Sequence, residues 1–326
     1  MTREDFVKKF QAELLANFPS GFQSWWPKFI FHYSDVNNIA SVLNAGILYS
    51  RDQAIRQGLM NNDNANDAVI SGTDNELKKY VRFYFGAKTP TQFRNEGIKT
   101  LASISNNAHC PVPVFLLFDF VKLLSLPDIH FSNGNIAAAK PEIYDDITDL
   151  KKLEFNYIYN RESLPSDPYS RHVIYCRHAE VLVRDKLKIE EFLKYICVRS
   201  EAERETLLSL MNKDVQKLYS DKIKVFTKDG IFYRDRLYVN KVTLSGQLLT
   251  IELANTKMNL FDVKTQYTVI DSGLTRISSY LQMATPTPLR FSFSVPVGPN
   301  GIDFSLFFDE NLVYKGRLLP DTDVPF

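Results

Sequence analysis

The sequence changes character near residue 221, where mixed helix and strand patterns give way to short runs of alternating apolar and polar residues. Turns containing glycine and asparagine, such as Gly298–Gly301, separate these runs. Such runs and turns are typical of antiparallel sheets. We expect strands at residues 223–227, 230–234, 248–253, 291–295, 304–308 and 312–314. Residues 221–326 are therefore predicted to form a β-rich, sandwich-like C-terminal domain that follows an α+β region.

The most apolar segment, Val112–Val121, is interrupted by Asp119. It is as long as one buried strand and much shorter than the ~20 apolar residues of a membrane span. The N-terminal residues carry charges where a secretory signal needs an apolar stretch. The cysteines, Cys110, Cys176 and Cys197, form neither a disulfide framework nor a Cys-x-x-Cys metal motif. We therefore expect a cytoplasmic protein.

The charge balance limits how the chain can meet a polyanion. Thirty-nine basic and 38 acidic residues leave a net charge of +1, so any nucleic-acid site must be a local patch. The sequence also has no Gly-x-Gly-x-x-Gly after a strand, no Walker loop, no His-Glu-x-x-His and no Gly-x-Ser-x-Gly. It therefore disfavours Rossmann dehydrogenases, P-loop ATPases, zincins and serine hydrolases.

The region before residue 221 mixes helix and strand patterns. Thr2 precedes two acidic residues and an apolar helical face, so residues 1–28 are predicted to be an N-terminal helical extension. A strand at 29–33 and a helix at 36–46 follow, with Gly46 as a left-handed cap. Further along we expect a loop at 57–76, a strand at 80–85, short helices and turns at 126–170, a strand pair or bulged strand at 171–183, a helix at 190–194, a strand at 195–198 and a helix at 200–211.

Four ordered segments resemble the DarT family of ADP-ribosyltransferases. They are the aromatic-histidine strand start Phe31-His32-Tyr33-Ser34, the strand Tyr80-Val-Arg-Phe-Tyr-Phe85, the turn Phe131-Ser-Asn-Gly-Asn135 and the strand Arg177-His-Ala-Glu-Val-Leu-Val183. The resemblance covers roughly residues 29–211. It implies an ADP-ribosyltransferase domain over residues 29–215, with a split β-sheet core and surrounding helices.

The resemblance also implies an activity. The protein would be an enzyme of the pentosyltransferase class. Members of the family split NAD at the nicotinamide–ribose bond and join ADP-ribose to a base in single-stranded DNA. NAD is then the donor substrate, and no metal is expected. A related phage-defence toxin, CmdT, modifies messenger RNA, and the residues leave DNA and RNA both open. Where many members read Pro-Arg-Ser-Pro-Met this chain has Gly86–Pro90, and Asn135 stands where some have histidine.

The same resemblance implies a biological setting. The protein would be the toxin of a toxin–antitoxin pair that blocks growth or phage replication. Its partner would be an antitoxin, either an ADP-ribosylglycohydrolase or a protein that binds the toxin. Two alternatives stay open: an enzyme that modifies protein or hydrolyses NAD, and a non-catalytic nucleic-acid-binding protein.

Glu180 is the expected catalytic carboxylate. Departure of nicotinamide leaves an oxocarbenium-like ribose, and a carboxylate ~4 Å away is worth about 4 kcal/mol at an effective dielectric near 20. The same carboxylate can accept the proton of the attacking base. Its apolar neighbours, Ala179 and Val181, predict a buried strand, in which an unpaired charge would be costly. Read alone, Glu180 would be an exposed strand carboxylate beside Arg177.

Other residues are assigned around this carboxylate. Arg51 joins Glu180 at the catalytic centre as a bidentate clamp for the pyrophosphate, and we expect His32 to face Glu180 across a cleft that holds the dinucleotide. Because neighbouring strand residues point to opposite faces, Tyr84 is favoured for the cofactor and Phe85 for the core. The predicted cofactor-binding residues are His32, Ser34, Asn38, Arg82, Tyr84 and Phe85. The predicted nucleic-acid-binding residues are Lys88, Arg94, Asn135, Tyr169, Arg171, Arg177 and His178.

Overall fold

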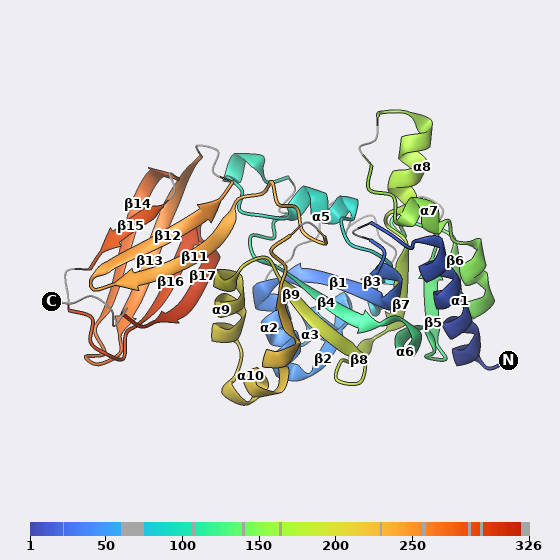
Figure 1. Ribbon diagram of the computed structural model, residues 1–326, viewed down its shortest axis with the longest axis horizontal. Coiled ribbons are helices and arrows are strands. Elements are labelled where there is room, and N and C mark those ends of the chain that lie inside the picture. The colour runs from blue at the N-terminus through green and yellow to red at the C-terminus, as the bar shows by residue number, and fades with distance from the viewer. Residues whose placement is uncertain are drawn as a thin grey trace.

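The computed structural model describes residues 1–21, 23–59, 75–105, 108–138, 141–162, 165–228, 230–255, 259–285, 288–293 and 296–320. An eight-stranded mixed sheet with helices around it fills one side of the molecule, and two smaller sheets fill the other (Figure 1). The α+β architecture with a C-terminal all-β part is therefore confirmed.

The central sheet builds the wall of the site described below. Its strands, in sheet order, are β10 (Ile223–Val225), β9 (Leu193–Val198), β4 (Pro113–Asp119), β1 (Phe29–Asp35), β3 (Tyr80–Tyr84), β7 (Glu180–Arg184), β5 (Ile129–Ser132) and β6 (Ile143–Tyr144). β4 is buried along almost its whole length, as its apolar sequence predicts. β1 pairs with β4 over seven residues but with β3 at one register position, so the sheet splits between β1 and β3.

The helices begin and end at ordinary sequence signals. Thr2 and Asp5 form the capping box of the first helix, and Gly46 ends the second with φ 67°. The helices are α1 (Arg3–Asn17), α2 (Val36–Ala45), α3 (Arg51–Arg56), α5 (Pro90–Asn95), α6 (Phe120–Leu124), α7 (Phe155–Ile158), α8 (Pro168–Cys176), α9 (Glu201–Leu210) and α10 (Lys213–Tyr219). β2 (Ile47–Tyr49), which follows α2 in the chain, pairs with β8 (Lys186–Lys188) in a separate two-stranded sheet.

The C-terminal part is a sandwich of two antiparallel sheets with a core of its own. One sheet contains β11 (Tyr238–Ser245), β12 (Leu248–Ala254) and β15 (Leu289–Ser292). The other contains β14 (Thr275–Ala284), β13 (Leu260–Val269), β16 (Ile302–Phe308) and β17 (Asn311–Leu318). The sandwich docks on α9, where Ser200 donates to the carbonyl of Val239 at 2.7 Å and Tyr314 donates to Glu205 at 2.6 Å. Figure 1 shows α9 between the two parts.

Several sequence predictions are wrong. Residues 171–176 of the expected strand region belong to helix α8 (Pro168–Cys176), because Asp167 caps its N-terminus and Pro168 fits the first turn. Residues 190–192 form a turn rather than a helix. The strand at 223–225 forms, but it pairs with β9 in the central sheet, and residues 230–234 are not a strand. The all-β part therefore begins at Tyr238.

Other expectations lie partly outside the described residues. Most of the loop predicted at 57–76 does so, as do residues 294–295 of one predicted strand. Within the described residues, no helix is both long and apolar enough to cross a membrane.

Candidate active site

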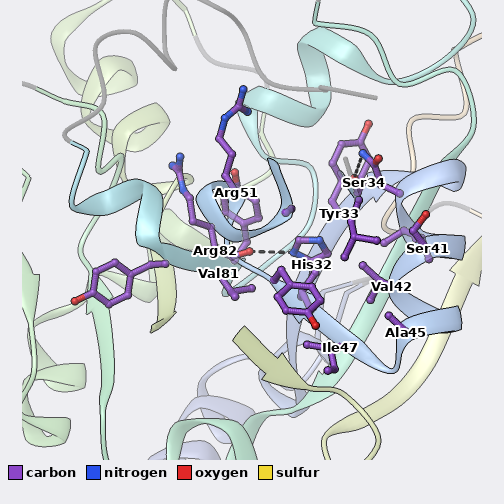
Figure 2. Close-up of a pocket in the computed structure, with 18 of the residues that line it drawn as sticks. His32, Tyr33, Ser34, Ser41, Val42, Ala45, Ile47, Arg51, Val81 and Arg82 are labelled. Carbon is purple, nitrogen blue, oxygen red and sulfur yellow. Dashed lines mark hydrogen bonds between the residues drawn. The ribbon is translucent and has the colours of Figure 1, made fainter. Parts of the chain in front are cut away.

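A cavity of about 250 Å³ opens where β1 and β3 separate. Backbone pairing closes a sheet, so the loss of pairing at this split leaves room between the strands for side chains and a ligand. Six of the residues that line the wall were selected by the sequence analysis: His32, Ser34, Asn38, Arg51, Arg82 and Tyr84. Figure 2 shows His32 at the centre of this wall, with Arg51 and Arg82 nearby.

His32 bridges the split in the sheet. Its Nδ1 donates a hydrogen bond to the carbonyl of Arg82 at 3.0 Å, which satisfies a carbonyl on β3 that strand pairing leaves open (Figure 2). Burial lowers the pKa of His32 to about 4, so the imidazole is neutral near pH 7. A neutral ring with its proton on Nδ1 presents Nε2 as an acceptor. His32 can therefore accept a hydrogen bond from a ligand hydroxyl or amide.

This burial makes stability depend on pH in a defined direction. An unfolded histidine has a pKa near 6.5, so the unfolded chain binds a proton that folded His32 excludes, and acidification favours unfolding. When the pH is lowered from about 7.5 to about 4.5, we expect the unfolding free energy of the wild type to fall by about 2–3 kcal/mol more than that of His32→Gln. Urea titration at each pH measures both values. Burial also raises the pKa of Asp35 to about 6 and of Glu96 to about 7, which acts in the opposite sense in both proteins. An equal loss in wild type and variant would contradict the assignment.

Glu180 and Arg82 form the strongest ion pair at the site. Arg82 Nε donates to Glu180 Oε2 at 2.5 Å and Nη2 donates to Oε1 at 2.5 Å, so both carboxylate oxygens are engaged. The Glu180 side chain is 0% exposed, whereas that of Arg82 is 32% exposed and lines the cavity. Glu180 does not line the cavity and so does not face His32 across an open cleft as expected, whereas Arg82, which engages both of its oxygens, does line the cavity.

The surroundings of Glu180 keep this carboxylate in one position. Burial raises the pKa of the Glu180 carboxyl, and the Arg82 charge opposes that rise. Burial, with Glu180 beside it, raises the pKa of Tyr84 to about 12, so the phenol stays protonated. Ser132 accepts a hydrogen bond from the Glu180 backbone N–H at 3.1 Å and donates to the carbonyl of Gly134 at 2.7 Å. The turn after β5 thus anchors the start of β7.

Of the remaining predicted residues, Arg51, Ser34 and Asn38 line the cavity and Phe85 does not. Ser50 caps α3, which puts Arg51 in its first turn and on the cavity. Asn38 Nδ2 donates to Ser34 Oγ at 3.2 Å within the wall, and Asp35 rather than Ser34 caps α2. Phe85 is misassigned as a cofactor residue, since its ring is fully buried and packs edge to face against Phe155 at 5.3 Å.

The sequence analysis missed part of the wall. Tyr33 donates to Asn95 at 2.9 Å, and both side chains line the cavity from elements more than 60 positions apart. Thr89 caps α5 and Pro90 occupies its first turn, so a helix start was readable there. That signal predicts a helix, but it does not say that Asn95 would meet Tyr33.

A cluster of cationic side chains lies near the end of β3 and the start of β7. Arg161 stacks over Trp26 at 4.5 Å. An added Cβ at Gly86 would come within 2.8 Å of the Trp26 ring and 3.0 Å of Arg161 Nη2, so glycine after β3 leaves room for this stacked pair. Burial, together with the smaller effect of the nearby Arg177 charge, lowers the pKa of Arg161 to about 9. Arg161 Nε and Nη2 and Arg177 Nε are buried with no acceptor among the described residues. Two close guanidiniums with unsatisfied donors form a local site that favours an anion.

Tyr233 connects this pair to other predicted nucleic-acid residues. Tyr233 is close enough to Arg161 and Arg177 for both charges to act on the pKa of its hydroxyl. Lys88 Nζ lies 5.5 Å from the centroid of its ring. His178 follows Arg177, and burial lowers its pKa to about 4. Arg94 is close enough to His178 to contribute to that shift. We call Lys88, Arg94, Arg161, Arg177, His178 and Tyr233 the cation cluster.

Three predicted nucleic-acid residues have other surroundings. Tyr169 and Arg171 lie in the first turns of α8, at the opposite end of the helix from Arg177. Tyr169 packs edge to face against Tyr157 at 5.7 Å, and Arg171 is exposed. Asn135 caps its own turn by accepting the Ala137 N–H at 2.9 Å.

Comparisons with known proteins bear on the fold and the family of the chain. No curated protein sequence matches the chain. The chain resembles Thermus sp. 2.9 DarT in complex with ADP-ribosylated ssDNA at 18% identity and a TM-score of 0.50, covering 64% of this chain and 97% of that one. Thermus sp. 2.9 DarT in complex with carba-NAD+ matches at 17% identity and a TM-score of 0.47, covering 64% and 98%. At such identity the first likeness shows a shared fold.

The family model described as ssDNA thymidine ADP-ribosyltransferase, DarT, matches residues 31–233. This range includes the split sheet, the cavity and the cation cluster, and it ends before the sandwich begins at Tyr238. Because the match covers more than half of the chain, this protein belongs to the DarT family of ADP-ribosyltransferases.

Proposed function

We propose that this protein transfers ADP-ribose from NAD+ to the base of thymidine in single-stranded DNA. The observation that carries the proposal is the buried Glu180 carboxylate behind the cavity-lining Arg82, in a chain that matches the DarT model. A cavity of about 250 Å³ suits the nicotinamide mononucleotide half of NAD+ and leaves the adenosine half outside. His32, Arg51 and Tyr84 are the residues proposed to hold that half.

The bond between nicotinamide and ribose breaks, and its electron pair leaves with nicotinamide. Glu180 accepts a hydrogen bond from a ribose hydroxyl and stabilises the positive charge that develops on the ribose. The thymine nitrogen attacks the anomeric carbon, and its proton passes to Glu180. N3 is the ring nitrogen of thymidine that carries a hydrogen, so N3 is the expected point of attachment.

Arg82 must move for this chemistry to occur. While its guanidinium engages both oxygens of Glu180, the pair is close to neutral and stabilises a neighbouring cation poorly. The diphosphate of NAD+ carries two negative charges and can compete for the guanidinium in the cavity. We therefore assign Arg82 two partners: Glu180 before NAD+ binds and the diphosphate in the complex.

The cation cluster is the proposed contact for the DNA strand. Its two close arginines offer positive charge to a backbone phosphate, and Tyr233 offers a ring for base stacking. A single strand suits this chemistry because pairing hides N3, and extruding a paired base costs a few kcal/mol. The net charge of +1 means that salt dependence should come from this cluster rather than from the whole protein.

Charge removal in the cluster tests that contact. We expect Arg161→Gln and Arg177→Gln each to weaken single-stranded DNA binding and to reduce the salt slope of the binding constant by about one. Fluorescence anisotropy with a labelled oligonucleotide at several salt concentrations measures both quantities. Arg171→Gln is the matched control, because it removes the same charge from the far end of α8. An equal effect of Arg171→Gln would show that general charge, not the cluster, holds the strand.

The enzyme is further proposed to be the toxin of a toxin–antitoxin system. An enzyme that modifies thymidine blocks template copying, so expression should arrest growth or phage replication unless an antitoxin protein opposes it. Expression of the wild type should reduce colony formation at least about tenfold relative to Glu180→Gln. Equal growth of both strains at equal soluble protein would contradict the toxin role.

The polymer is tested with labelled NAD+. The protein is incubated separately with single-stranded DNA, messenger RNA and a protein pool, and the labelled products are digested and analysed by mass spectrometry. Label on thymidine supports the proposal. Label on RNA, label on protein, or release of free ADP-ribose alone would each overturn the DNA assignment and favour the corresponding alternative. Absence of any product would favour a non-catalytic binding protein.

A further inference from the structure

Three potential metal ligands meet between α7 and α8, outside the cavity. His172 Nε2 lies 2.7 Å from Glu154 Oε2, and Cys176 Sγ lies 3.6 Å from His172 Nε2 and 3.8 Å from Glu154 Oε2. Within the described residues, these atoms form a group in which every pair of ligand atoms is within 4.8 Å. The proposed transfer reaction uses none of the three residues.

The spacing of these atoms fits a tetrahedral zinc ion. Bond lengths near 2.3 Å for sulfur and 2.0–2.2 Å for nitrogen and oxygen put ligand atoms about 3.2–3.7 Å apart. Both distances to Cys176 Sγ are close to this range. The distance between Glu154 and His172 must open by roughly half an ångström. Those two side chains are 50% and 47% exposed, so they have room to do so.

The local structure holds the ligands in this arrangement. His172 and Cys176 are four residues apart on α8 and therefore share one face of the helix. Glu154 occupies the N-cap position of α7, and the Tyr157 ring packs edge to face against the His172 ring at 5.3 Å. The chelate thus combines one helical turn with one residue from a separate element.

We propose that Glu154, His172 and Cys176 form a zinc site with a fourth position for water. Thiolate and imidazole together select zinc over calcium or magnesium, which require oxygen ligands. Zinc binds His172 through Nε2 in place of the hydrogen bond to Glu154, so the ring proton moves to Nδ1 by exchange with solvent, and the Cys176 thiol releases its proton to solvent. The ion links the start of α7 to the last turn of α8, four residues before Glu180, and so stabilises the segment that leads into β7.

Metal binding to the full-length, tag-free protein tests this directly. After treatment with a chelator and its removal, one equivalent of Co²⁺ should produce a thiolate-to-cobalt charge-transfer band, and Zn²⁺ should abolish the band. Isothermal titration with Zn²⁺ should show one site, and thermal unfolding should shift upward with added Zn²⁺. These measurements do not involve NAD+ or DNA, so their outcome is independent of the proposed function.

Variants assign the binding to these residues. We expect His172→Gln and Cys176→Ala to weaken Zn²⁺ binding at least about tenfold and to remove the cobalt band. His172 is half exposed, so its variant should fold even if a change at buried Cys176 does not. Cys197→Ala is the matched control, since Cys197 is a buried free cysteine on β9 and should leave binding unchanged. Absence of zinc binding by the wild type, or binding that survives both changes, would overturn the proposal.

Discussion

Replacing Glu180 by glutamine is expected to lower the rate of ADP-ribose transfer about a thousandfold while the chain stays folded. Glutamine has the shape of glutamate but lacks its charge, so it neither stabilises the ribose cation nor accepts the base proton. The freed Arg82 can turn toward solvent, because its side chain is already 32% exposed. Single-turnover transfer to an oligonucleotide at saturating NAD+ measures the chemical step.

Glu203→Gln is the matched control for this experiment. Glu203 is also a buried carboxylate paired with a buried arginine, Arg199, but Glu203 lies in the first turn of α9 and neither residue lines the cavity. Its replacement should lower stability yet leave the transfer rate of the folded protein within a few-fold of wild type. If Glu180→Gln keeps more than about a tenth of the wild-type rate, Glu180 is not the catalytic carboxylate.

Replacing Arg82 by methionine is expected to lower the unfolding free energy by about 3–5 kcal/mol. The change leaves the 0% exposed Glu180 carboxylate without its bidentate partner. A second change, Glu180→Leu, removes that buried charge, so the double variant should recover most of the loss. Urea unfolding of the wild type, both single variants and the double variant gives the coupling between the two residues.

An exposed ion pair of the same geometry provides the comparison. Arg317 also binds a carboxylate with two hydrogen bonds, to Asp303 at 2.8 and 3.0 Å, but these side chains are 59% and 49% exposed. Arg317→Met should therefore cost less than about 1 kcal/mol. Equal losses for Arg82→Met and Arg317→Met, or a double variant no more stable than Arg82→Met, would contradict the buried-pair interpretation.

Local signals in the sequence predicted much of the fold. Thr2 and Gly46 marked helix ends that the structure contains, and the apolar run after Val112 became a central strand. These features succeed because capping and alternation act over a few residues. Strand β14 was missed because it is an edge strand exposed on both faces, so it has no apolar alternation to read.

The site was less predictable because it depends on register and long-range contact. The sequence suggested Arg177 as the neighbour of Glu180, whereas its partner is Arg82, 98 positions earlier. That pairing follows from the register of β3 against β7, in which Tyr84 lies opposite Glu180. Arg161 was missed because its role depends on its approach to Gly86 and Trp26, which no spacing along the chain reveals.

The most direct test of the account is a crystal structure of the wild-type protein with a non-hydrolysable NAD+ analogue. We expect the nicotinamide ribose in the cavity beside His32, a ribose hydroxyl within hydrogen-bond distance of Glu180, and Arg82 turned to the diphosphate. An analogue bound elsewhere would contradict the account. So would an analogue in the cavity with Arg82 still engaging both oxygens of Glu180 and no ribose contact to the carboxylate.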